Sequence, residues 1–205
     1  METKTQTNNK NQAALQDEET SGAQLGSKNN TAKKGNSSLR LIFEELLNDT
    51  YNAEKQLVKA LPELVQAAYN EDLQEAFETH LEETKKQVTR LERVYERLRI
   101  NKQEEKCKAM EGLVEEAKKI IKEHDESPLR DSALIIAAQK VEHYEIAAYG
   151  SLRELADVLG YHQVYDLIDR TLQEEEYTDI LLTEIAMDVN DEAYETGLGE
   201  EKEEE

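Results

Sequence analysis

The sequence predicts an all-α fold: a four-helix bundle with an additional short helix that crosses between the second and third long helices. Apolar residues recur at spacings of three and four through most of residues 39–189. The 205 residues include only two prolines, eight glycines and no tryptophan, which disfavours a β fold with frequent turns. Both prolines and three of the glycines lie within residues 39–189, mostly where helices should begin or end.

Four long segments and one short segment show the helical periodicity. The first includes residues 46–65, the second covers about 71–100, the third covers about 130–159, and the fourth begins near Val164. A shorter amphipathic segment, about 110–123, lies between the second and the third. Helices of about 28 residues would each be about 42 Å long, a length typical of a bundle.

Residues at the ends of these segments favour helix termini. Asn70 interrupts an apolar period, and Ser127 followed by Pro128 is typical of an N-cap and the first helical position. Gly160 is expected just beyond the end of the third long helix. Pro62 lies inside a helical pattern and predicts a local kink.

The charge of the chain is distributed unevenly over three regions. The net charge of −21 divides into +1 for residues 1–38, −15 for residues 39–189 and −7 for residues 190–205. We expect a disordered polar N-terminal tail, one helical domain and a disordered acidic C-terminal tail, in that order. The acidic balance argues against nucleic acid and anionic membranes as partners, since both are bound by clustered cations.

The sequence favours the cytoplasm. No apolar stretch approaches the roughly 20 residues that span a bilayer, and no secretory signal or transit peptide is readable at the N-terminus. The single cysteine, Cys107, cannot form an internal disulfide, as is typical of a reducing compartment. We interpret Cys107 as a buried or inert thiol.

Each long helix interrupts its apolar stripe with acidic residues near its middle: Glu54, Glu83, Glu142 with Glu145, and Glu175. A single inward glutamate is usually half exposed or paired with a basic residue. The spacings of 29 residues between Glu54 and Glu83 and of 30 between Glu145 and Glu175 instead place the carboxylates of two helical hairpins at one level. Such a layer needs protons or cations, so we predict two divalent metal ions, iron first, with manganese or zinc as alternatives.

Histidine and tyrosine side chains lie near these acids in the sequence. His80 is on the stripe of Glu83, one turn earlier, so it is a candidate ligand or hydrogen-bond donor to a ligand, with an ordinary core histidine as the alternative. Tyr149, four residues after Glu145, is a candidate to line the site, with boundary packing as the alternative. We expect the other three histidines on the surface or at helix ends.

Five segments resemble the bacterial YciF-like, ferritin-like stress-response family, catalogued as a domain of unknown function: residues 49–57, 80–84, 106–113, 139–150 and 171–179. The resemblance implies a ferritin-like bundle, a homodimer and a rubrerythrin-like dinuclear metal centre. Ferritin-like di-iron proteins usually carry Glu-x-x-His on two helices, but here Lys86 follows Glu83 and Thr178 follows Glu175 at that spacing. The pair Glu142-x-x-Glu145 does resemble the doubled carboxylate of rubrerythrins.

Two functions follow as hypotheses. The first is a dinuclear metal protein of stress defence that oxidises Fe(II) or reduces peroxide, so that a metal ion or a small oxidant is the substrate. The second is a non-catalytic, dimeric helical protein with a structural or interaction role and a vestigial metal site. The sequence assigns no catalytic residue in either case.

Overall fold

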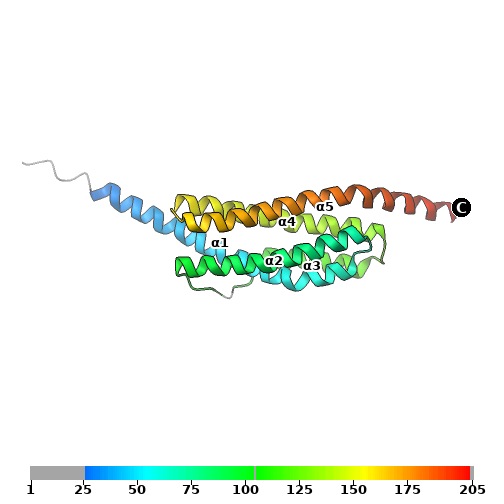
Figure 1. The fold of residues 1–205 in the computed structure, drawn as a ribbon, viewed down its shortest axis with the longest axis horizontal. Coiled ribbons are helices and arrows are strands. Elements are labelled where there is room, and N and C mark those ends of the chain that lie inside the picture. Colours follow the sequence, from blue (N-terminus) through cyan, green and yellow to red (C-terminus); the bar gives the residue numbers. More distant parts are fainter. Residues whose placement is uncertain (1–25, 104, 204–205) are drawn as a thin grey trace, which may run out of the picture. The chain divides into compact units, whose positions relative to one another are not determined.

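The computed structural model describes the backbone of residues 26–103 and 105–203, and the side chains of residues 38–103 and 105–197. Every regular element in this part of the chain is an α-helix (Figure 1). The helices are α1 (Gly26–Ala67), α2 (Glu71–Leu98), α3 (Lys108–Glu123), α4 (Pro128–Val158) and α5 (His162–Glu203). This confirms the predicted all-α fold, with a short helix between the second and third long ones.

The chain divides into two units, residues 1–35 and residues 36–205. Helix extends beyond the predicted domain, because residues 26–38 and 190–203 are helical where the sequence predicted disorder. Lengthening an existing helix adds a hydrogen bond for each residue that is fixed, so such segments need no core of their own. The rest of the predicted tails, residues 1–25 and 204–205, lies outside the described residues.

The helix ends follow the predicted capping residues. The Asn70 side chain accepts a hydrogen bond of 3.1 Å from the backbone N–H of Leu73 and begins α2. Ser127 caps α4 with Pro128 as its neighbour, and Gly160 has a φ of 74° just after α4. A positive φ favours glycine, so the turn between α4 and α5 depends on this residue. Pro62 lies inside α1, as expected.

Two clusters of buried apolar side chains form the core of the second unit, and each contains residues from all four long helices. The first includes Leu57, Phe77, Leu134 and Leu182. The second includes Leu47, Leu91, Leu152 and Ile168. The second cluster precedes the first along α1 and α5 and follows it along α2 and α4, so α1 and α5 run in one direction and α2 and α4 in the other.

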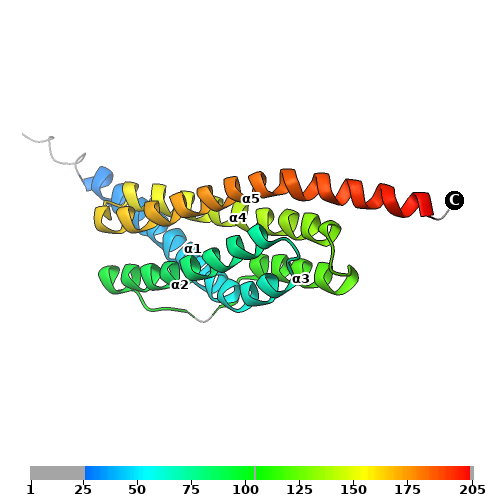
Figure 2. The same cartoon turned by 45° about the vertical axis from the view of Figure 1, so that its right-hand side comes forward.

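The chain between α2 and α4 makes this topology possible. Helices α2 and α4 run in the same direction, so residues 99–127, which contain α3, return the chain along the bundle. Helix α3 packs against α4, and α4 and α5 lie side by side in both views (Figures 1 and 2). None of the described helices has the length and apolar character that crossing a membrane requires.

A buried carboxylate joins the start of α4 to the turn between α1 and α2. Asp131 accepts hydrogen bonds from the backbone N–H groups of Tyr69, at 2.9 Å, and Asn70, at 2.6 Å. The neighbouring Arg130 side chain donates to the carbonyl oxygen of Ala67. These bonds satisfy backbone groups that the helix ends would leave unpaired and fix one end of the bundle.

Candidate metal centre

A layer of buried polar side chains separates the two apolar clusters. Five of its members can ligate a metal, and each is at most 3% exposed: Glu54, His80, Glu142, Glu145 and Glu175. Every long helix contributes at least one of them, at the point where its residues pass from one apolar cluster to the other. Four of the five acidic residues predicted at one level therefore lie in a buried layer, and Glu83 does not.

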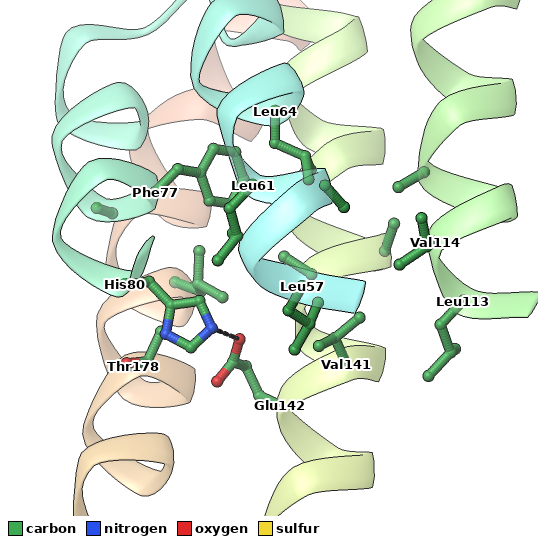
Figure 3. A pocket seen from close by; sticks show the side chains of 16 residues that line it. Leu57, Leu61, Leu64, Phe77, His80, Leu113, Val114, Val141, Glu142 and Thr178 are labelled. Atoms are coloured by element: carbon green, nitrogen blue, oxygen red, sulfur yellow. Dashed lines mark ion pairs between the residues drawn. The ribbon is translucent and has the colours of Figure 1, made fainter. Parts of the chain in front are cut away.

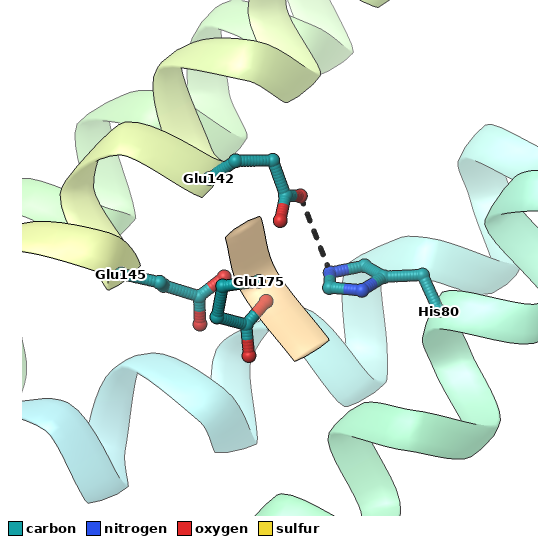
Figure 4. Close-up of side chains that lie close together, drawn as sticks. All are labelled: His80, Glu142, Glu145 and Glu175. Atoms are coloured by element: carbon teal, nitrogen blue, oxygen red, sulfur yellow. Dashed lines mark ion pairs between the residues drawn. The ribbon is translucent and has the colours of Figure 1, made fainter. Parts of the chain in front are cut away.

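Four of these side chains form a close group (Figure 4). His80, Glu142, Glu145 and Glu175 each offer one ligand atom, and these four atoms all lie within 4.8 Å of one another. Glu142 and Glu145 point into the group from the same face of α4 because their spacing is close to one helical turn. The imidazole comes from α2 and the remaining carboxylate from α5.

Most ligand atoms of the layer have no hydrogen-bond partner. Nε2 of His80 lies 3.4 Å from Oε1 of Glu142 without hydrogen-bond geometry, and Nδ1 is also unpartnered. Neither carboxylate oxygen of Glu145 is bonded, and one oxygen each of Glu54, Glu142 and Glu175 is free. Buried polar atoms without partners cost free energy, so this donor set fits a metal ion that would accept these lone pairs.

Burial controls the protonation of the layer. It raises the pKa of Glu54 and of Glu142 to about 8. Burial and then the neighbouring carboxylates raise the pKa values of Glu145 and Glu175 well above the ordinary range. Burial also lowers the pKa of His80 to about 4, so its imidazole is neutral near pH 7. A neutral imidazole is ready to ligate, whereas the carboxyl groups must release protons when a metal binds.

Two further side chains orient the carboxylates. The Tyr149 hydroxyl donates to Oε1 of Glu54, and both residues are fully buried. Nε2 of Gln87 donates to Oε1 of Glu175 at 2.5 Å. Hydrogen bonds of this kind hold metal ligands in position and influence affinity. Each leaves the second carboxylate oxygen unpartnered.

A buried arginine beside the layer is already paired. Arg90 forms two hydrogen bonds of 2.6 Å to the carboxylate of Glu174 and a third, also of 2.6 Å, to Thr171. Its charge lowers the pKa of Glu54, but burial outweighs this effect. Within residues 38–103 and 105–197, no lysine or arginine forms an ion pair with Glu54, Glu142, Glu145 or Glu175.

The predicted site residues occupy different places in this layer. Glu142, Glu145 and Glu175 form the close group together with His80, which the sequence left open as a ligand, a hydrogen-bond donor or a core residue. Glu54 is buried outside that group, and its charge raises the pKa of Glu145. The structure leaves Glu83 half-buried and outside the four, although its charge contributes to the raised pKa of Glu142.

Gln87 and Arg90 are two residues at the layer that the sequence did not predict as part of the site. Gln87 follows Glu83 by four residues on the stripe that should face the core, and it is fully buried. A polar residue on a core-facing stripe was the signal in the sequence that Gln87 belongs to the site. Its partner on α5 is 88 residues away in the chain, so the pairing itself had no local signal.

The remaining predictions concern single residues. His124, His143 and His162 are exposed, as expected. Cys107 is buried and caps α3, and burial raises the pKa of its thiol, as expected of an inert cysteine.

Comparison with known proteins places the chain in a family. Residues 38–195 match the family described as "Domain of unknown function (DUF892)". Protein YciF of Escherichia coli (strain K12) is 52% identical over 149 residues, which cover 71% of this chain and 89% of the relative. The crystal structure of the E. coli stress protein YciF superposes with a TM-score of 0.73 at 49% identity, covering 75% of this chain and 97% of the other.

Two further solved structures share the fold. YcfI from Rhodopseudomonas palustris, provisionally described as a structural protein, has a TM-score of 0.67 at 36% identity and covers 71% of this chain and 92% of its own. A protein from Xanthomonas campestris pv. campestris has a TM-score of 0.62 at 21% identity, with coverages of 78% and 99%, and supports the fold alone. The extent of the family match and the identity to YciF together show that this chain belongs to the DUF892 family.

Proposed function

We propose that this chain is a ferritin-like protein of stress defence that binds two divalent metal ions in its polar layer. The observation that carries the proposal is the group of four buried side chains whose ligand atoms lie within 4.8 Å of one another. Most of the nitrogen and oxygen atoms of these side chains have no hydrogen-bond partner. Carboxylate and imidazole ligands suit iron, with manganese or zinc as alternatives. The description of E. coli YciF as a stress protein supports the physiological setting.

Five buried residues would hold the two ions. His80, Glu142, Glu145 and Glu175 would hold them at the centre of the layer, and Glu54 would complete the set from α1. The four buried carboxylates, once deprotonated, carry the charge that two divalent cations balance. Glu83 is half-buried, so it would lie on the solvent side of the layer.

The proposed activity is oxidation of Fe(II) or reduction of peroxide, with a metal ion or a small oxidant as substrate. The bound metal would supply the electrons for this chemistry. The protein would supply a water-poor layer, a neutral imidazole at His80, and carboxylates held by Tyr149 and Gln87. Protons leave the carboxyl groups when the ions bind, because their pKa values are raised in the metal-free protein.

Metal analysis and thermal unfolding test the proposal. Protein purified without chelator should contain metal, and added Mn(II), Zn(II) or, without oxygen, Fe(II) should raise the melting temperature. A ligand at 100 times its dissociation constant stabilises the folded state by about 2.7 kcal/mol. The double variant Glu142→Gln with Glu175→Gln should lose the shift.

The matched control changes two exposed acids of the same type, Glu78→Gln with Glu176→Gln, and should keep the shift. Wild-type protein without metal, whose melting temperature is the same with every ion, would contradict the proposal. That result would favour a structural or interaction protein with a vestigial site, the alternative supported by the provisional description of the R. palustris relative.

We also propose a homodimer in the cytoplasm. Four apolar side chains on α5 are more than half exposed: Tyr177, Ile180, Met187 and Tyr194. Their spacings of three and seven residues place them in one stripe, which a second copy of the chain would cover. Light scattering should give twice the chain mass for the wild type and a monomer for Ile180→Lys with Met187→Lys.

The proposed location in the cytoplasm rests on Cys107. This cysteine is buried and unpaired, which fits a reducing compartment.

A further inference from the structure

An apolar cavity lies beside the metal-ligand group. Side chains of all five helices line it, and about 30 Å³ remains in which the centre of a water-sized molecule can lie. Figure 3 shows Leu57 and Phe77 on its walls, with the imidazole of His80 and the carboxylate of Glu142 at one end. A single water needs roughly 10–15 Å³ of such space, so the cavity can hold a molecule somewhat larger than water.

The lining does not favour water or charged solutes. Only three of the sixteen lining residues have polar side chains, His80, Glu142 and Thr178. The Thr178 hydroxyl already donates to the backbone oxygen of Glu174 at 3.1 Å. A buried water needs two to four polar partners, and this cavity offers them only at its His80 and Glu142 end. Its remaining surface suits a small uncharged molecule.

Helix α3 forms the outer wall of the cavity. Leu113 and Val114 both line the cavity and are half-buried, so part of each residue is in contact with solvent. Ala117, also on this wall, is buried. A small apolar molecule can enter here through side-chain motion, whereas an ion would lose its hydration without replacement.

We propose that this cavity binds a neutral molecule of the size of dioxygen and holds it next to His80 and Glu142. The unpartnered nitrogens of the buried His80 mark the end at which the molecule would meet the proposed ions. The role as an oxidant site rests on the proposed function. The binding of a small apolar molecule does not, and it is testable on metal-free protein.

Xenon is a suitable probe, because it is apolar, uncharged and visible by anomalous scattering. Crystals of the full chain under xenon pressure should show one site in this cavity. Ala138→Leu would fill the cavity and should abolish the site, whereas Ala147→Leu, on the exposed face of α4, should keep it. Val114→Ala would enlarge the cavity at a half-buried position and should increase xenon occupancy. This second variant tests binding in the cavity even if Ala138→Leu does not fold.

Two results would overturn the inference: no xenon in the cavity of wild type or Val114→Ala, or ordered water throughout its apolar part. The link to the metal centre is tested separately. Ala138→Leu should bind Mn(II) with wild-type affinity within about twofold but slow dioxygen-dependent oxidation of Fe(II) at least fivefold. Xenon binding together with unchanged oxidation rates in that variant would overturn the oxidant role. Failure of the proposed metal function would appear as absent Mn(II) binding in the wild type.

Discussion

The Gln87 side-chain amide on α2 donates a 2.5 Å hydrogen bond to the Glu175 carboxylate on α5. Both side chains are fully buried, and Glu175 belongs to the group of four candidate ligands. The bond therefore holds a candidate ligand from a neighbouring helix and leaves one of its oxygens for a metal.

Replacing Gln87 by leucine should weaken metal binding about 10- to 100-fold, the usual effect of losing a hydrogen bond to a ligand. The reason is that Glu175 would lose the donor that orients it. Competition titration with a chelating dye measures the affinity. Gln66→Leu, an exposed change of the same type on α1, should leave affinity unchanged. Equal affinities of Gln87→Leu and wild type would show that Gln87 does not position Glu175.

Tyr149→Phe should shift metal binding towards higher pH. The hydroxyl of Tyr149 donates to Glu54 and opposes the rise in the pKa of Glu54 that burial causes. Without this donor the carboxyl group holds its proton more strongly, so a higher pH is needed before Glu54 can ligate. Mn(II) affinity measured from pH 6 to 9 checks this, with the exposed Tyr177→Phe as control. A pH profile identical to that of wild type would contradict a role for the hydroxyl.

Metal-free protein should lose stability as the pH rises from about 6.5 to 8. The pKa values of Glu54 and Glu142 are raised from 4.5 to about 8, so the folded state holds protons that the unfolded state has released. For each proton that only the folded state holds, the free energy of unfolding falls by about 1 kcal/mol per unit rise in pH in this window. His80 opposes this trend only weakly, because its pKa is lowered from 6.5 to about 4 and most of its effect on stability lies between these values.

Urea unfolding at several pH values, with a chelator present, measures this slope. Glu142→Gln with Glu175→Gln should flatten it, and saturating metal should reverse it because metal competes with the protons. A wild-type stability that increases from pH 6.5 to 8 without metal would be inconsistent with protonated carboxyl groups in the layer.

Asp131→Ala should destabilise the fold by about 3 kcal/mol, since it leaves two backbone N–H groups, of Tyr69 and Asn70, without their acceptor. For a chain of this size the melting temperature should fall by roughly 6–12 °C. Asp131→Asn keeps one acceptor oxygen and should cost less. The exposed Asp125→Ala should change stability by less than about 0.5 kcal/mol. Loss of less than about 1 kcal/mol in Asp131→Ala would mean that solvent replaces the carboxylate.

The helix ends could be predicted because their signals are local. Asn70 and Ser127 cap helices with their own side chains, and Gly160 supplies a backbone conformation that other residues avoid. The tails were harder, because the helical state of residues 190–203 is an extension of α5 rather than a property of their acidic composition.

The level of the acidic layer could also be predicted, but its inner arrangement could not. His80 and Glu83 are one turn apart on the same stripe, so their order of depth depends on the rotation of α2 against its neighbours. Packing sets that rotation, and it brings His80 inside while Glu83 stays half-buried. The contact of Tyr149 with Glu54 joins residues 95 positions apart, which periodicity within one helix cannot reveal.

The polar layer gives the bundle two separate apolar clusters instead of one continuous core. Each of the two ends of the helical bundle is therefore stabilised by its own cluster, and the layer of ionisable groups lies between them. Under the proposed function, bound metal stabilises this layer, so the stability of the bundle depends on the metal available in the cell. Resistance to proteases would then rise and fall with metal availability, so the abundance of the protein in the cell would follow the metal that it binds.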